Sequence, residues 1–175
     1  VALKNIVDAL NYVINVDTDV TVLLETMAGK GTECGKNIEE IKYLLNNVIF
    51  KNKIGVCLDT CHLSDSGVDL NNFDSYLKEF DNLIGIDKIG CIHINDSKNP
   101  LESKKDRHEN IGYGYIGFDN LINVIYNDKL KNVPKILETP YIGDFPPYKF
   151  EIKMIKDKKF NPNLTKDVLE YYKNL

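Results

Sequence analysis

Arginine, histidine and long apolar runs are all scarce in this sequence of 175 residues. Only one of its 22 lysine and arginine residues is an arginine, Arg107, and only three residues are histidines. No run approaches the roughly 18 apolar residues of a membrane-spanning helix, which excludes such spans and predicts a soluble chain. The chain also lacks an initial methionine, and the helical apolar spacing of residues 1–16 begins at once. We therefore expect it to start inside a larger protein.

Two further patterns that could assign a function are absent. The glycine-rich stretch at 28–36 misses the spacing of a phosphate-binding P-loop by one residue, and Asn37 replaces its serine or threonine. The cysteines contain no CxxC pair, so we expect reduced, mostly buried thiols and an intracellular protein. The net charge of −4 does not suggest a nucleic-acid-binding protein, although bound divalent cations would add positive charge at a carboxylate site. The four cysteines are Cys34, Cys57, Cys61 and Cys91.

Short apolar runs alternate with amphipathic stretches along the chain. The runs are rich in β-branched residues and predict buried parallel strands at 19–26, 53–60, 88–95 and 133–139. The stretches between them repeat apolar residues at three- and four-residue spacing and predict helices at 37–50, 71–85 and 117–128. Their expected capping or first-turn residues are Asn37, Asn71 and Asp119. One or two closing helices are expected in the tail, after a proline-rich loop at 140–148.

Repeated strand–helix units predict an α/β fold with a parallel sheet. A complete (β/α)8 TIM barrel needs about 250 residues. We therefore expect residues 1–175 to form a single domain with about four C-terminal βα units of such a barrel. The predicted strands 19–26 and 133–139 would then be unpaired edges, which invite association.

The residues that carry chemistry gather at the predicted strand ends and in the segments that follow them, with Asp106 and His108 in the long loop after the third predicted strand. In parallel α/β folds these ends meet at one rim, where functional side chains collect. A single carboxylate there is typically a helix cap, and a single histidine is typically a core or surface residue. Here all three histidines and four carboxylates share the rim, and imidazole with carboxylate suits Zn²⁺ or Mn²⁺. The sequence therefore predicts a multi-metal site formed by Glu25, Asp59, His62, His93, Asp106, His108 and Glu138.

The only arginine lies in the same region, between His93 and His108. Because lysine fills nearly all other basic positions, a retained arginine indicates a need for its forked set of donors. Arg107, Lys98 and Lys105 are therefore predicted to contact a phosphate. Tyr113 and Tyr115 could stack on a nucleotide or pack beneath the predicted loop at 97–110.

Four segments resemble the endonuclease IV family of apurinic/apyrimidinic endonucleases. They are LLETMAGKGTECG (23–35), GVCLDTCHLSDSGVD (55–69), HINDSKNPLESKKDRHENIGYGYIG (93–117) and ILET (136–139). Members of this family are (β/α)8 barrels with three zinc ions that cleave DNA 5′ to abasic sites in base-excision repair. The resemblance implies phosphodiester hydrolysis by a metal-activated hydroxide, with abasic double-stranded DNA as partner. It also implies a monomer in full-length form and no membrane partner.

The resemblance also implies a role for each site residue. Glu25 resembles the carboxylate that bridges the first and second metals, and with Glu138, which orients the nucleophile, it is a predicted catalytic residue. The remaining ligands of the second metal are Asp59, His93 and Glu138. The ligands of the third metal are His62, Asp106 and His108.

The chain departs from the family at a few positions. The first metal of the family also takes two histidines from the amino-terminal half, and no residue here replaces them, so seven of nine expected ligands are present. Glu102 and Ser103 stand where a Gly-Ser pair is usual, and Leu63 stands where an aromatic residue or alanine is common.

Two other functions compete with this interpretation. A sugar isomerase or epimerase of the xylose-isomerase-like barrels would use a single metal on Glu25, Asp59, His93 and Glu138, which leaves the other histidines unexplained. A non-catalytic, nucleic-acid-binding or structural half-barrel would need no complete metal site.

Overall fold

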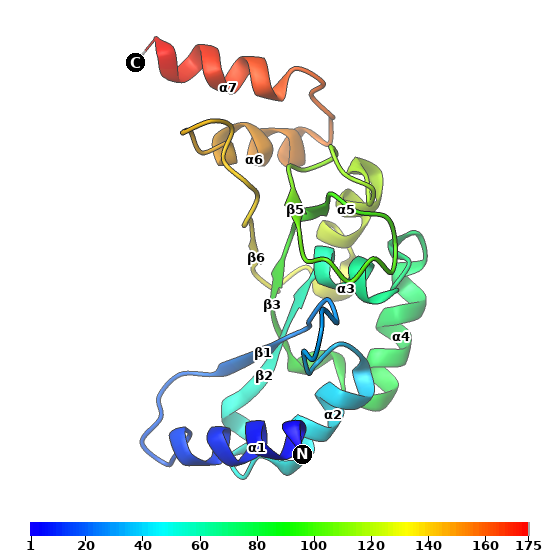
Figure 1. The fold of residues 1–175 in the computed structure, drawn as a ribbon, viewed down its shortest axis with the longest axis vertical. Helices are drawn as coiled ribbons and strands as arrows, with labels where there is room; N and C mark the ends of the chain where they lie inside the picture. The colour runs from blue at the N-terminus through cyan, green and yellow to red at the C-terminus, as the bar shows by residue number, and fades with distance from the viewer. Residues whose placement is uncertain (175) are drawn as a thin grey trace.

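A parallel four-stranded sheet forms the centre of the structure, a computed structural model that describes residues 1–174 (Figure 1). Its strands follow the order β1–β2–β3–β6, so β1 and β6 are the edges, as predicted. All three strand pairs are parallel, which confirms the predicted α/β fold. The strands are β1 (Val22–Glu25), β2 (Ile54–Asp59), β3 (Ile89–His93) and β6 (Lys135–Ile136).

The helices between the strands cover the convex side of a crescent-shaped molecule, whereas the first helix lies at one end of the crescent and the two closing helices lie at the other (Figure 1). Three of them occupy the predicted stretches: α2 (Ile38–Asn47), α4 (Phe73–Leu83) and α5 (Phe118–Ile125). The first helix and the two closing helices are also present as predicted: α1 (Ala2–Val13), α6 (Tyr148–Asp157) and α7 (Leu164–Lys173). Within residues 1–174, no helix is both long enough and apolar enough to cross a membrane.

The helix starts test the predicted caps. Asn37 caps α2, because its side-chain oxygen accepts the backbone N–H of Glu40 at 2.9 Å. Asp119 lies in the first turn of α5, as predicted. The prediction for Asn71 was wrong, because a 3₁₀ turn precedes α4 and Asp69 accepts the N–H of Asn71 instead.

A short helix, α3 (Thr60–Ser66), directly follows β2 and was not predicted. Asp59 caps this helix by accepting the N–H of His62 at 2.9 Å, and Gly67 ends it at φ +111°. The first six residues of α3 are buried although most of them are polar, so the segment shows no apolar repeat of helical period in the sequence.

The last strand is much shorter than predicted. Only Lys135 and Ile136 pair with β3, so Glu138 lies two residues beyond the strand rather than at its end. The ladder stops because β3 itself ends at His93. Beyond it, the Asn95 side-chain oxygen accepts the N–H of Glu138 at 3.0 Å and continues the pairing by one bond.

A second, two-stranded sheet orders the loop that follows β3. Strand β4 (Asp96–Ser97) pairs antiparallel with β5 (His108–Glu109), which places His108 in a strand instead of the predicted loop. The Asp96 carboxylate lies at the base of this loop. It accepts the backbone N–H groups of four residues that follow β5: Gly112, Gly114, Ile116 and Gly117.

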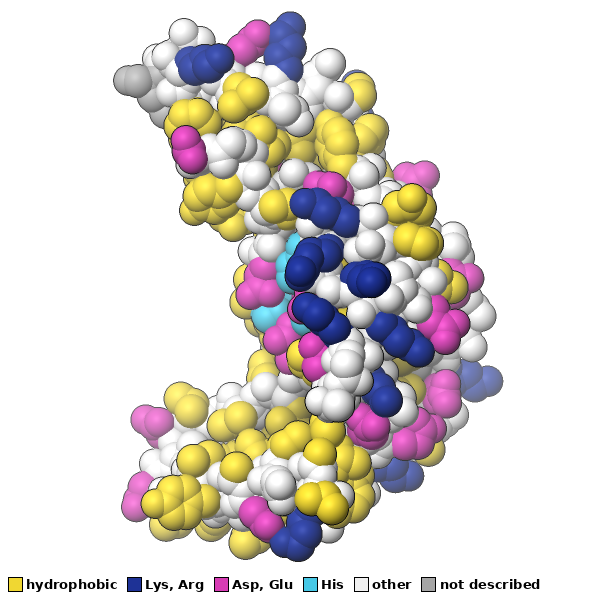
Figure 2. Space-filling model, viewed as in Figure 1, with side chains coloured by type: hydrophobic (Ala, Val, Ile, Leu, Met, Phe, Trp, Pro, Cys, Tyr) yellow, Lys and Arg dark blue, Asp and Glu magenta, His cyan; other side chains and the backbone are white. Residues whose placement is uncertain are grey.

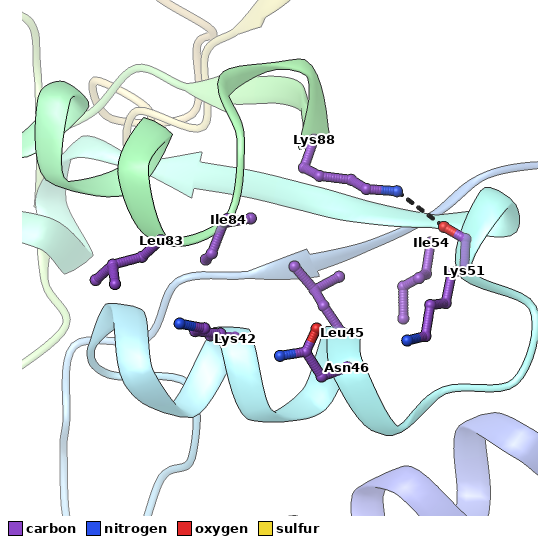
Figure 3. Close-up of a pocket in the computed structure, with 8 residues that line it drawn as sticks. All are labelled: Lys42, Leu45, Asn46, Lys51, Ile54, Leu83, Ile84 and Lys88. Carbon is purple, nitrogen blue, oxygen red and sulfur yellow. Dashed lines mark hydrogen bonds between the residues drawn. The ribbon is translucent and has the colours of Figure 1, made fainter.

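A small pocket lies at the end of the sheet where β2 begins, opposite the carboxyl ends of the strands (Figure 3). Its volume is about 90 Å³, and its lining includes Lys42, Lys51 and Lys88. Lys88 Nζ donates to the carbonyl oxygen of Lys51 at 2.9 Å. Ile54, the first residue of β2, also lines the pocket, whereas Asp59 ends that strand at the other rim. The pocket is therefore separate from the residues that were predicted to bind metals.

Candidate metal centre

The carboxyl ends of the central strands place the predicted ligands side by side. Glu25, Asp59 and His93 are the last residues of β1, β2 and β3, and Asp59 pairs directly with His93 in the strand register. Figure 2 shows histidine side chains among acidic and basic ones in the hollow of the crescent. This arrangement follows from parallel strands, whose carboxyl ends meet at one edge.

Four residues form the first cluster, which we call the four-residue group: Glu25, Asp59, His93 and Glu138. One ligand atom from each lies within 4.8 Å of the others. His93 Nδ1 lies 3.0 Å from Glu25 Oε1, 3.1 Å from Glu138 Oε2 and 3.9 Å from Asp59 Oδ2. One ring nitrogen can donate only one proton, so three carboxylates around it favour a bound cation.

The second cluster, the three-residue group, consists of His62, Asp106 and His108. Asp106 Oδ1 lies 3.1 Å from His62 Nε2 and 3.7 Å from His108 Nε2. Asp59 also borders this group, because its Oδ2 lies 3.7 Å from His108 Nε2. The buried Asp59 carboxylate therefore lies between the two groups.

Backbone carbonyls fix the orientation of both imidazoles in the three-residue group. His62 Nδ1 lies 2.8 Å from the carbonyl oxygen of Thr26, and His108 Nδ1 lies 3.2 Å from that of Glu138. A carbonyl only accepts, so each Nδ1 carries a proton, and Nε2 is the ring nitrogen that could bind a metal. The Nε2 atom of His108 is buried and has no hydrogen-bond partner among the described residues. This arrangement is typical of metal-binding histidines and fits a cation.

The electrostatics of the three-residue group favour positive charge. Burial lowers the pKa of His62, but Asp59, the Thr26 carbonyl, Asp106 and Glu25 outweigh this effect, so the pKa is raised. Since imidazole gains stability as a cation here, the same carboxylates would stabilise a bound metal ion.

Asp65 holds the three-residue group together and was missed in the sequence. It is fully buried on α3, where its Oδ2 accepts the N–H groups of Lys105 at 3.0 Å and Asp106 at 2.7 Å. Its Oδ1 accepts the hydroxyl of Ser97 at 2.8 Å. Asp106 has a left-handed backbone with φ +53°, which these bonds stabilise. Asp65 lies about one helical turn after His62. This spacing would have identified Asp65 in the sequence if α3 had been predicted.

Asn95 performs a similar task in the four-residue group. Its amide nitrogen donates to Asp59 Oδ2 at 2.7 Å, and its oxygen accepts the N–H of Glu138 at 3.0 Å. The Thr60 hydroxyl holds the Asn95 backbone by donating to its carbonyl at 2.6 Å. Asn95 follows His93 by two residues, and this strand-like spacing was the available signal in the sequence.

Glu151 supports the far side of the site from α6. Its fully buried carboxylate accepts the N–H of Ile111 at 3.0 Å, the amide of Asn110 at 3.1 Å and the Thr139 hydroxyl at 2.5 Å. These partners lie close in sequence to His108 and Glu138. Burial raises the pKa of Glu151, although the three hydrogen bonds act in the opposite direction.

This raised pKa predicts a pH dependence of stability. The folded chain holds the Glu151 proton more tightly than the unfolded chain does. The contribution of Glu151 to the free energy of unfolding is therefore full below the ordinary glutamate pKa of about 4.3 and falls as pH rises through the raised pKa. Chemical denaturation from pH 4 to 7, a range of about three pH units around these pKa values, should show this fall in wild type and a flatter profile for Glu151→Gln. Parallel profiles would contradict the prediction.

The predicted phosphate-contacting residues lie beside the groups. Arg107, Lys98 and Lys105 are exposed, and Figure 2 shows basic side chains bordering the histidines. Arg107 Nη1 donates to the carbonyl oxygen of Asp106 at 2.9 Å. Tyr113 packs against Phe160, with ring centroids 5.1 Å apart.

Residues 1–173 match the family model for xylose isomerase-like TIM barrels, so the chain belongs to this family of barrel proteins. Within it, the resemblance to endonuclease IV is confirmed by relatives that are each named probable endonuclease 4. The relative from Mesoplasma florum is 53% identical over 160 residues, which cover 91% of this chain and 55% of the relative. The relative from Bacillus subtilis is 49% identical over 174 residues, which cover 96% and 59%.

Comparison with solved structures also identifies an endonuclease IV as similar to this chain. The crystal structure of endonuclease IV from Thermus thermophilus matches with a TM-score of 0.68 and 30% sequence identity. The match covers 78% of this chain and 49% of that one. The chain thus spans about half the length of the relatives that it matches.

Proposed function

We propose that this chain is part of a zinc-dependent apurinic/apyrimidinic endonuclease that hydrolyses the DNA phosphodiester 5′ to abasic sites. The observation that carries this proposal is the three-residue group, in which backbone carbonyls hold Nδ1 of His62 and of His108 while both Nε2 atoms lie close to Asp106. A second ligand set beside the four-residue group suits phosphodiester hydrolysis, where charge develops on both the attacking and the leaving oxygen. The names of the relatives support the same substrate class.

The donor set fits zinc. Imidazole nitrogen and carboxylate oxygen are ligands that zinc and manganese share, and both groups combine them. Bound divalent ions supply Lewis-acid stabilisation of phosphoryl oxygens and lower the pKa of water. Glu25, Asp59, His93 and Glu138 would hold one ion, and His62, Asp106 and His108 another.

The side chains of the four-residue group divide the remaining work. Asp59 is fully buried and held by Asn95, so it acts as a fixed ligand. The Glu138 side chain is 46% exposed and can accept a hydrogen bond from the attacking water, which orients the lone pair of its oxygen toward phosphorus. As the new P–O bond forms, the bond to the 3′ oxygen breaks; the attacking water loses its proton to solvent, and the leaving 3′ oxygen takes one up from solvent. Glu25 contributes negative charge on the same side of His93.

Recognition of the substrate would depend on backbone contacts and DNA shape. Lys105 and Arg107 flank Asp106 in the sequence, and the backbone N–H of Lys98 donates to the carbonyl oxygen of Arg107 at 2.9 Å. These three exposed side chains therefore supply positive charge close to the three-residue group, which suits phosphates. An abasic site offers no base edge to read, so its local deformability is the feature that a protein can detect.

The four-residue group alone also suits a single-metal sugar isomerase, the other function that the family description favours. The number of bound ions distinguishes the two functions. We expect elemental analysis of the purified chain to find two or more zinc ions, and a full-length barrel that contains it to cut abasic double-stranded DNA on the 5′ side of the lesion. A single manganese, magnesium or cobalt ion without incision would favour the isomerase, and absence of both metal and incision would favour a non-catalytic half-barrel.

A further inference from the structure

Two thiols lie directly beneath the four-residue group. Cys57 on β2 and Cys91 on β3 are paired in the strand register, and so are Asp59 and His93 two residues further along. Side chains two residues apart in a strand point to the same face of the sheet. Each cysteine therefore lies one layer below a residue of the four-residue group.

The two thiols and His93 form a compact cluster of their own. The Sγ atoms of Cys57 and Cys91 and one ring nitrogen of His93 all lie within 4.8 Å of one another. Both cysteines are buried and neither forms a disulfide. Cys34 and Cys61 lie outside this cluster. The proposed hydrolysis uses neither Cys57 nor Cys91, so the chemistry of the cluster remains unassigned.

We propose that Cys57, Cys91 and His93 form an additional metal site for a soft, thiophilic divalent ion such as Cd²⁺. Two sulfur ligands with one imidazole select soft ions over Mg²⁺ or Mn²⁺, which prefer oxygen. Binding releases one proton from each thiol, so two thiolates balance the two positive charges of the ion.

The position of His93 in both clusters gives this site a consequence. Its ring is shared with Glu25 and Glu138, which lie 3.0 and 3.1 Å from Nδ1. An ion held by the thiolates draws the imidazole away from these carboxylates and leaves the four-residue group with oxygen ligands alone. Thiophilic metals therefore weaken metal binding at the four-residue group. This consequence, unlike the thiolate site itself, rests on the proposed function.

Titration of the metal-free chain with Cd²⁺ tests the site. We expect the ultraviolet charge-transfer absorption of cadmium–thiolate bonds in wild type, and loss of most of it in Cys57→Ser and in Cys91→Ser. Cys61→Ser is the matched control, because Cys61 is also a buried thiol but lies outside the cluster, and this variant should keep the absorption. Absence of the absorption in wild type, or its persistence in both cluster variants, would overturn the proposal.

A second measurement on wild type covers the case in which the serine variants fail to fold. The cadmium NMR shift should report two sulfur ligands, whereas a shift typical of nitrogen and oxygen ligands alone would contradict the site. Neither readout requires DNA cleavage. Cadmium–thiolate bonds in this chain, together with no incision by a full-length barrel that contains it, would therefore refute only the proposed function. Zinc binding and incision by that barrel, with no thiolate signal, would refute only this site.

Discussion

Glu138→Gln is expected to reduce incision of abasic DNA by about a hundredfold or more in a full-length barrel that contains this chain. The amide keeps the size of the side chain but removes the negative charge 3.1 Å from His93 Nδ1. It also removes one of the two oxygens that can accept a hydrogen bond from the attacking water. The loss should appear in kcat, because orientation of the nucleophile matters most in the transition state.

A matched control separates this effect from a general loss of charge. Glu79→Gln makes the same chemical change on the exposed face of α4 and should leave incision unchanged. Thermal unfolding of both variants should remain close to that of wild type. Near-normal turnover of Glu138→Gln would refute the catalytic role of Glu138 while leaving the other ligands untouched.

Asp65→Ala is expected to lower the free energy of unfolding by about 3 kcal/mol, because it leaves buried donors without partners. The N–H groups of Lys105 and Asp106 and the hydroxyl of Ser97 all lose their acceptor. Asp106 then loses the bond that stabilises its left-handed backbone. We therefore also expect one metal ion fewer per chain, measured by elemental analysis alongside urea denaturation.

Two comparison variants identify the cause. Asp65→Asn should be milder, since its amide oxygen can accept both backbone N–H groups while its amino group donates to the Ser97 hydroxyl. Asp19→Ala removes an exposed carboxylate before β1 and should change stability by less than about 0.5 kcal/mol. A loss below about 1 kcal/mol in Asp65→Ala would mean that water replaces these bonds and that Asp65 does not hold the loop.

Local chemistry made much of this protein readable from the sequence alone. The β-branched runs that end in Glu25, Asp59 and near His93 gave the parallel strands, because burial on both faces requires apolar residues throughout. Asn37 was identified as a cap because the short side chain can reach the orphan N–H groups of the next turn. The seven candidate ligands were found because the carboxyl ends of parallel strands meet at one edge.

The tertiary structure decided the features that depend on contacts between distant segments. Helix α3 buries polar side chains and therefore has no apolar repeat to reveal it. Glu138 leaves the sheet early because β3 ends and the Asn95 side chain takes over its pairing. The ring orientations of His62 and His108 follow from hydrogen bonds to carbonyls 36 and 30 residues away. The pairing of Cys57 with Cys91 needed the strand register. A sequence pattern reports which side chains a segment buries, whereas hydrogen bonds between segments exist only once the chain has folded.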